Sequence, residues 1–149
     1  LSAEADEYDQ PLTSRCGNCT RCLDACPTKA LEAPFLLNSG RCLSYLTIEH
    51  REAIPPAEGK KMGNKIYGCD ECQTACRNRF STPCQTPELQ PTDAFMQMEK
   101  KNWHALTEEQ YRVIFKGSAV KRAKYTGLMR NIHQVESNNK DEVQTLPDV

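Results

Sequence analysis

The stretch RCGNCTRCLDACPTKA, residues 15–30, places four cysteines within eleven positions and follows the last of them with a proline. The spacing C-x2-C-x2-C-x3-C-P is typical of chains that bind two [4Fe-4S] clusters, in which three close thiolates hold one cube and the fourth thiolate holds the other. The stretch therefore predicts a pair of iron–sulfur clusters, and the second cluster requires further cysteines elsewhere in the chain.

Two other uses of cysteine fit the sequence less well. The chain holds nine cysteines, whereas a disulfide framework expects an even number and a secreted context, and cysteines three residues apart are poor bridging partners. Structural zinc usually takes two separated CxxC pairs, but in this chain a third and a fourth cysteine follow the first pair without a gap. The spacing therefore favours a double-cluster ferredoxin module.

The later cysteines repeat the spacing of the first four, except that their leading cysteine lies further upstream in the chain. Cys69, Cys72 and Cys76 reproduce the x2 and x3 spacings, and Cys42 fills the vacant position. The predicted ligands of one cluster are Cys16, Cys19, Cys22 and Cys76, and those of the other are Cys26, Cys42, Cys69 and Cys72. Cys84 is left over, and we expect it to be an unliganded thiol.

The composition leaves little apolar material for a core. Hydrophobic residues make up 38% of the 149 residues and aromatic residues 7%, and the mean hydropathy is -0.68. Such a chain is marginal by burial alone, so we expect cluster assembly and folding to be coupled. No apolar run approaches the roughly 18 residues of a membrane span, and the first ten residues are acidic, unlike a signal peptide. We expect a cytoplasmic protein without membrane contact.

The predicted fold is an α-rich α+β arrangement, a bacterial-type double [4Fe-4S] ferredoxin module with a helical C-terminal extension. The chain starts on Leu1 rather than Met, so we expect a preceding domain. The predicted segments are a linker from a missing N-terminal domain at 1–15, the double-cluster domain at 16–91 with an insertion at 43–68, a helical extension at 92–135 and a flexible tail at 136–149. An insertion beside the second cluster fits a wall or docking surface for the electron acceptor, and it also fits an ordinary surface excursion.

Local patterns place the secondary structure. FLLN, residues 35–38, predicts a short strand, and Ser39 or Gly40 opens a helix that carries Cys42 and ends before the prolines at 55 and 56. DAFMQMEKKNWHAL, residues 93–106, predicts one helix, and Thr107 with Gln110 forms a capping box for the next. Residues 119–135 predict a third helix, whose apolar stripe is Val120, Ala123, Leu128, Ile132 and Val135.

Basic residues gather in the helical extension. From Tyr111 to Val135 the chain holds six lysines and arginines and no acidic residue. Such a run is most often a solvated helix surface, and it also fits a face that binds phosphates. The residues alone leave both interpretations open.

Four segments together carry a family resemblance: RCGNCTRCLDACPTKAL, RCLSYLTIE, MGNKIYGCDECQTAC and FKGSAVKRAKYTGLMRNI. They resemble the C-terminal half of the epoxyqueuosine reductases, from about Tyr8 to Ile132. The resemblance implies an enzyme that reduces epoxyqueuosine to queuosine in tRNA with cobalamin, fed by two [4Fe-4S] clusters and an external electron donor. Its cluster ligands agree with the assignment made from spacing.

The resemblance also implies roles for single residues. Ser44 is similar to a position that faces the cobalamin, Arg51 to a basic position near the tRNA, and Lys121, Arg122 and Arg130 to a basic motif that binds tRNA. Most of the cobalamin pocket and the proton donor would belong to the N-terminal domain, so no residue of this chain is expected to be catalytic. Arg77 stands where the family usually has a proline.

Two other functions remain open on the sequence alone. One is a related cobalamin-dependent reductase of the reductive dehalogenase type, which would differ in substrate and would not bind tRNA. The other is a standalone electron-transfer ferredoxin without a catalytic partner domain.

Overall fold

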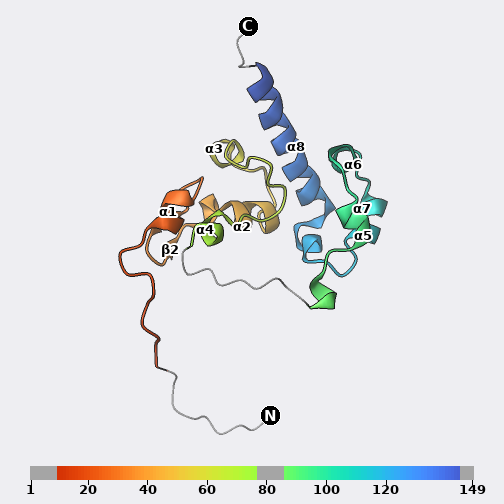
Figure 1. Ribbon diagram of the computed structural model, residues 1–149. Coiled ribbons are helices and arrows are strands. Elements are labelled where there is room, and N and C mark those ends of the chain that lie inside the picture. The colour runs from red at the N-terminus through yellow and green to blue at the C-terminus, as the bar shows by residue number, and fades with distance from the viewer. Residues whose placement is uncertain (1–9, 77–85, 145–149) are drawn as a thin grey trace.

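The computed structural model describes residues 10–76 and 86–144 (Figure 1). The predictions for Arg77 and Cys84 lie outside these ranges, as do the predictions for 1–9 and 145–149 at the two ends. The described chain is rich in helix, with one two-stranded hairpin in those ranges. None of the helices described has the length and apolar character that crossing a bilayer requires.

The elements follow one another along the chain in two parts, with 3-10 helices labelled η. The first part holds α1 Arg21–Ala25, β1 Leu31–Ala33, β2 Leu36–Leu37, η1 Ser39–Arg41, α2 Leu43–Ile48, α3 Pro56–Gly59 and α4 Glu71–Thr74. The second part holds η2 Pro87–Leu89, α5 Asp93–Met96, α6 Lys100–His104, α7 Glu108–Ile114, η3 Ala119–Ala123 and α8 Lys124–Gln144.

The cysteine-bearing helices lie together at one end of the molecule. Helices α1 and α4 contact each other, and Figure 1 shows them beside α2 and the hairpin. The hairpin is antiparallel, with Leu31 opposite Leu37, and it confirms the predicted strand. Phe35 at its turn has a φ of 64° and is 89% exposed. Neither α1 nor α4 buries a residue, so little apolar packing holds these two helices against each other.

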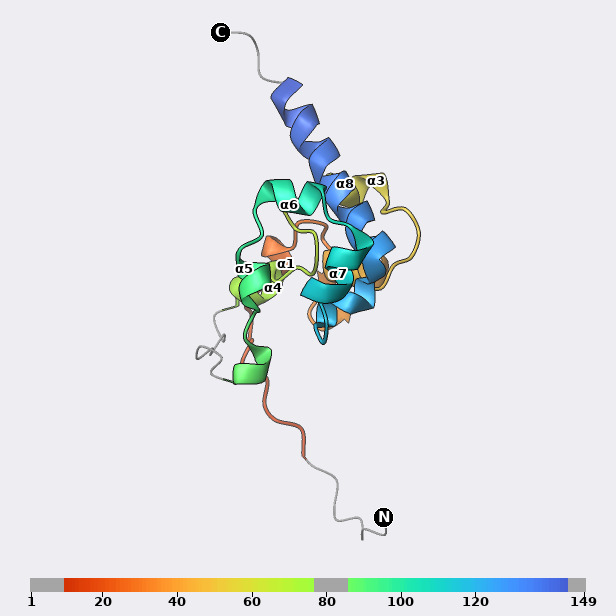
Figure 2. The same ribbon diagram turned by 90° about the vertical axis from the view of Figure 1, so that its right-hand side faces the viewer.

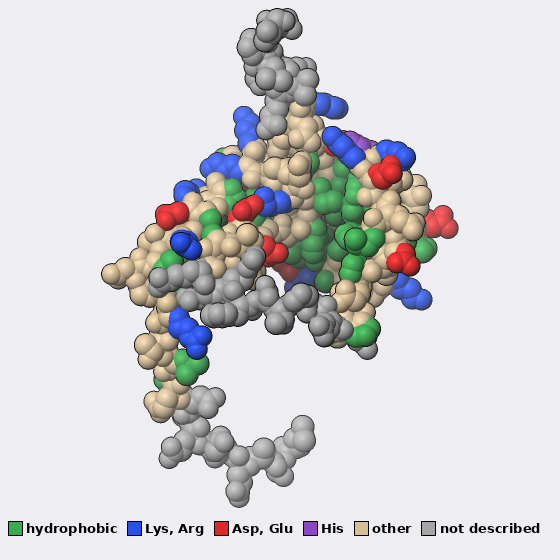
Figure 3. Space-filling view, viewed as in Figure 1, with side chains coloured by type: hydrophobic (Ala, Val, Ile, Leu, Met, Phe, Trp, Pro, Cys, Tyr) green, Lys and Arg blue, Asp and Glu red, His purple; other side chains and the backbone are tan. Residues whose placement is uncertain are grey.

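Helix α8 runs between the two parts of the fold and packs on two apolar clusters (Figures 1 and 2). The first core consists of Leu43, Leu46, Ile54, Met62 and Val135. The second core consists of Leu106, Tyr111, Phe115, Leu128 and Ile132. Figure 3 shows hydrophobic side chains gathered in the hollow between α8 and the α5–α7 side. Since α8 contributes to both cores, it joins the cysteine-bearing part to the helical extension.

The capping box at Thr107 is confirmed. Its hydroxyl accepts the Gln110 N–H at 3.2 Å, and the Gln110 side chain accepts the Thr107 N–H at 2.9 Å, so α7 begins as predicted. The single helix predicted over residues 93–106 is wrong. Glu99 starts a new helix within that range, because its extended backbone places its N–H on Asn102 Oδ1 at 2.8 Å. A local side-chain bond of this kind competes with helix continuation.

The helix predicted to carry Cys42 is also different. A 3-10 turn, η1, ends before Cys42, whose extended backbone (φ -73°, ψ 119°) precedes α2. Cys42 therefore lies at the N-cap of α2 rather than inside a helix. Pro56 begins the short helix α3, since proline is compatible with a first helical turn.

The third predicted helix begins later and ends later than expected. Residues 119–123 form η3, and a positive φ of 61° at Lys124 separates it from α8. The expectation of a loose end from Glu136 is wrong up to Gln144, because α8 continues to that residue. Asn138 Nδ2 donates to the Gly59 carbonyl at 2.8 Å, so α3 supports this last part of the helix.

Candidate metal centre and basic surface

The candidate metal centre is built from two short helices and the turns beside them. Cys16 is exposed, and the other described cysteines are partly buried and form no disulfides. Those in or next to α1 are Cys16, Cys19, Cys22 and Cys26, and those in or next to α4 are Cys69, Cys72 and Cys76. Since α1 and α4 contact each other, the fold brings the two cysteine groups together.

The Cys26 sulfur receives hydrogen bonds of the kind that stabilise a thiolate. The Ala30 N–H donates to Sγ at 3.2 Å, and the Thr28 hydroxyl lies 3.7 Å from it. Burial alone would raise the pKa of the Cys26 thiol, but hydrogen bonds from the backbone of Leu31, the Thr28 side chain and other backbone groups outweigh it and lower the pKa. The thiolate is the form that binds iron, so this turn favours a ligand.

Cys72 lies within electrostatic reach of two other predicted ligands. Burial raises the pKa of the Cys72 thiol, and the neighbouring thiolates of Cys69 and Cys26 raise it further. Cys69 also packs against the first core, which contains Leu43, the residue after Cys42. Cys72 therefore lies within electrostatic reach of Cys26 and Cys69, and Cys69 shares the first core with Leu43.

The donor set fits iron–sulfur cubes by its chemistry. Within the described ranges, no three His, Cys, Asp or Glu side chains converge on the position of a single metal ion. A [4Fe-4S] cube differs from a single ion because each thiolate binds its own iron atom, so its ligands surround a larger group. Clustered soft thiolates without disulfides in the described chain suit such a cube.

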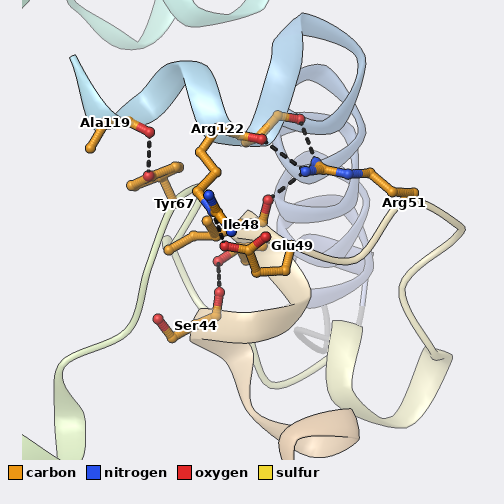
Figure 4. Close-up of polar contacts among 9 residues, drawn as sticks. Ser44, Ile48, Glu49, Arg51, Tyr67, Ala119 and Arg122 are labelled. Atoms are coloured by element: carbon orange, nitrogen blue, oxygen red, sulfur yellow. Dashed lines mark hydrogen bonds and ion pairs between the residues drawn. The ribbon is translucent and has the colours of Figure 1, made fainter. Parts of the chain in front are cut away.

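A second feature is the basic turn, which we define as η3 with Lys124. Three side chains fix its backbone: the Tyr67 hydroxyl donates to the Ala119 carbonyl at 2.7 Å, the Tyr111 hydroxyl donates to the Val120 carbonyl at 3.3 Å, and Ser118 Oγ accepts the Val120 N–H at 3.2 Å. Figure 4 shows this turn above α2, with Tyr67 reaching it from the side.

Two arginines connect the basic turn to α2. Arg51 donates to the carbonyls of Arg122 at 3.0 Å and Ala123 at 3.3 Å, which places a cation at the C-terminal end of η3 (Figure 4). The Arg122 guanidinium donates from Nε to the Glu49 carboxylate. This hydrogen bond, with the charges of Arg122 and Arg51, lowers the pKa of Glu49.

Arg130 makes only internal contacts with its guanidinium. It donates to the carbonyls of Leu46 at 2.8 Å, His50 at 2.8 Å and Glu52 at 2.6 Å, and twice to Asn131 Oδ1. These bonds use all five N–H donors of a guanidinium. Burial and the nearby charge of Arg51 lower the pKa of Arg130. The geometry therefore leaves Arg130 no donor for a phosphate.

Lys121 and Ser44 differ from these arginines. Lys121 is exposed, and its ammonium makes no hydrogen bond or ion pair with the described residues. Ser44 lies half-buried in the first turn of α2, two residues after Cys42 (Figure 4). Its expected contact with cobalamin stays a prediction.

Two buried polar residues were not singled out as site residues from the sequence. Thr47 and Asn131 are both 0% exposed. Asn131 interrupts the apolar face of α8 between Leu128 and Ile132, and a polar residue within such a stripe is the signal that would have found it.

Comparison with known proteins agrees with this site. Residues 15–78 match the family model of the 4Fe-4S double cluster binding domain, which confirms an iron–sulfur domain but not each ligand. Epoxyqueuosine reductase from Cellulophaga algicola is 44% identical over 84% of this chain. Over this length, the chain belongs to the epoxyqueuosine reductase family. It spans about two fifths of that relative's length, at 41%.

Solved structures of epoxyqueuosine reductase share the fold. A selenomethionine-labelled form has a TM-score of 0.79 at 34% identity, over 92% of this chain and 36% of the other. Another epoxyqueuosine reductase, with an epoxyqueuosine-modified tRNA-Tyr stem loop, has a TM-score of 0.71 at 32% identity, again over 92% and 36%. The similarity thus covers both the metal centre and the helical extension.

Proposed function

We propose that this chain is the electron-transfer and tRNA-docking part of an epoxyqueuosine reductase, which reduces epoxyqueuosine to queuosine in tRNA. The observation that carries the proposal is similarity across 92% of this chain to an epoxyqueuosine reductase with a modified tRNA stem loop. The double-cluster match at residues 15–78 supports the electron-transfer role. A role in tRNA modification fits a cytoplasmic location.

In this proposal the thiolates are shared crosswise between two [4Fe-4S] clusters. Each half of the chain gives three thiolates to one cluster and a fourth to the other, and the contact between α1 and α4 supports this arrangement. An external donor would reduce the first cluster, and single electrons would pass from it to the second cluster and on to the cobalamin expected beside Ser44. The ligands are Cys16, Cys19, Cys22 and Cys76 for the first cluster, and Cys26, Cys42, Cys69 and Cys72 for the second.

Cobalamin would supply the cobalt chemistry that removes the epoxide oxygen. In this chain we assign one contact to it, the half-buried hydroxyl of Ser44, which fits a neighbouring polar cofactor because it lies in the first turn of α2, two residues after Cys42. The remaining contacts would come from a cobalamin domain of the same protein.

The basic turn would hold the RNA backbone. Lys121 is exposed and Arg122 is held at the surface by Glu49, so both can reach phosphates. Arg51 and Arg130 would act beneath them, because Arg51 donates to carbonyls of the turn and Arg130 donates from α8 to carbonyls in and after α2. Phosphate contacts of this kind position an RNA without reading its sequence.

Charge reversal at Lys121 tests the docking role. Lys121→Glu should weaken binding of an epoxyqueuosine-modified stem loop about tenfold and reduce the slope of log affinity against log salt by about 1. Lys140→Glu is the matched control, because Lys140 is an exposed lysine on α8 far along the helix from the basic turn. Equal affinities for parent and Lys121→Glu across salt would remove the RNA role and favour a dehalogenase-like reductase or a standalone ferredoxin.

Metal content tests the electron-transfer role. Anaerobically purified protein should contain about eight irons per chain, since each of two cubes holds four. The holoenzyme with cobalamin should convert the modified stem loop to its queuosine form under reducing conditions. Zinc in place of iron, or cystines in place of thiols, would contradict the proposal.

A further inference from the structure

We propose that Thr47 and Asn131 are positioning residues for the second cluster, which hold the chain segments bearing Cys42 and Cys69 in register through buried hydrogen bonds. The inference rests on the proposed function, because it takes the crosswise ligand assignment as given. Thr47 and Asn131 are fully buried polar side chains, and in this proposal they bind no iron themselves but hold the ligand-bearing segments in place.

The Thr47 hydroxyl joins the two segments directly. It donates to the Leu43 carbonyl at 2.7 Å, in the residue after Cys42, and accepts the Gly68 N–H at 2.9 Å, in the residue before Cys69. Gly68 has a φ of 73°, which a side-chain-bearing residue rarely adopts, so the chain turns sharply into the ligand. One hydroxyl therefore sets the position of the backbone beside both thiols.

Asn131 reinforces this connection from α8. Its Nδ2 donates to the Thr47 carbonyl and to the Ile66 carbonyl, both at 2.8 Å. Its Oδ1 accepts from Nε and Nη2 of Arg130 at 3.1 and 2.8 Å. A guanidinium can only donate and a carbonyl can only accept, so these four bonds permit a single orientation of the amide.

The surrounding contacts show why this register depends on polar bonds. Cys69 and Ile66 are only partly buried where they pack on the first core, and apolar contacts resist sliding less than directional hydrogen bonds do. Loss of either polar side chain would leave buried backbone groups unpaired, which a small shift of the Gly68 segment would relieve. Such a shift would move the Cys69 sulfur relative to Cys42.

Thr47→Val tests the proposal, because valine keeps the shape of threonine and removes its hydroxyl. The variant, purified anaerobically, should lose iron from about eight toward about four per chain. Any second cluster that remains should show a changed electron paramagnetic resonance signal and a shifted midpoint potential, while the first cluster keeps both. Thr47→Ser retains the hydroxyl and should restore the parent values.

Asn131→Asp provides an independent test from the other side of the network. The aspartate still accepts from Arg130 but cannot donate to the carbonyls of Thr47 and Ile66. It should affect the same cluster as Thr47→Val. Tyr125→Phe is the matched control, because it removes a partly buried hydrogen bond, to the Leu106 carbonyl at 2.9 Å, from the second-core side of α8. It should leave both clusters unchanged.

The outcomes separate the two proposals. Parent protein without iron would defeat the proposed function, whereas parent protein with about eight irons leaves the positioning role to be decided by the variants. Full iron and unchanged potentials in both Thr47→Val and Asn131→Asp would overturn the positioning role. An equal loss of iron in Tyr125→Phe would also overturn it, since the effect would then reflect general destabilisation.

Discussion

The cysteine-bearing end and the helical extension are built on different physical principles. In residues 10–41, Ala30 is the one buried hydrophobic residue, and α1 and α4 bury none. The extension instead packs aromatic rings: Phe115 lies 5.3 Å from Tyr111 and 6.1 Å from Trp103 between ring centroids. The cysteine-bearing end gathers thiols, whereas the helical extension packs an apolar core. We therefore expect the two regions to respond differently to loss of iron and to loss of apolar contacts.

The largest expected effect is on the cysteine-bearing end when iron is removed. Anaerobic chelation should leave amides in residues 16–41 and 70–76 nearly unprotected, because no apolar core replaces the clusters there. Amides of α7 and α8 should stay protected by the second core. Hydrogen exchange read by mass spectrometry measures both regions in one sample.

Chelator preloaded with iron is the control for that experiment. Uniform loss of protection over both regions would show that the chain unfolds as one unit. The two regions would then not differ in how their stability depends on iron.

Cys42→Ser tests the ligand assignment within the cysteine-bearing end. Cys42 completes the proposed second cluster, so the variant should fall from about eight irons per chain to about four and keep the first cluster's signal. Iron analysis with electron paramagnetic resonance measures both. Full iron content in this variant would contradict the ligand assignment.

Phe115→Ala disturbs the other region. Phe115 is 2% exposed and packs in the second core, so truncation should cost about 3–5 kcal/mol of unfolding free energy. Denaturant titration of the extension measures the loss, and iron per chain should be unchanged. Val113→Ala is a suitable control, because Val113 lies on α7 two residues before Phe115 and is 71% exposed. Loss of iron in Phe115→Ala would show that the second core also supports the clusters.

The smallest expected effect concerns the contact between the two regions, at Glu49 and Arg122. The pKa of Glu49 is lowered from its usual 4.5, chiefly by the hydrogen bond from Arg122, so the stabilisation is present above that pH and is lost as pH falls through the lowered pKa. Glu49→Gln should therefore be slightly less stable than the parent at pH 7, and the difference should shrink below about pH 4. Denaturant titrations at both pH values measure it; a constant difference would contradict the linkage.

The sequence predicted local features well. The capping box at Thr107 depends on residues three apart, and the short strand before η1 lies within one hairpin, so both are readable from a few neighbouring residues. The break between α5 and α6 at Glu99 is also local, but the sequence did not predict it. The residues on both sides favour a helix, and nothing in their pattern indicates the bond from Glu99 N–H to the Asn102 side chain. The length of α8 was missed for another reason: its last turns are polar, and Asn138 binds Gly59 from a distant segment.

By itself, the sequence predicted the iron–sulfur chemistry of the candidate metal centre, because cysteines three and four residues apart are spaced as cluster ligands. It also determined that the extension is basic. Only the tertiary structure decided what each charge does: Arg51 and Arg130 bind carbonyls of segments more than seventy residues away, whereas Lys121 faces solvent. The physical reason is that a guanidinium binds whichever acceptors folding brings within about 3 Å, and those partners lie far from it in the chain.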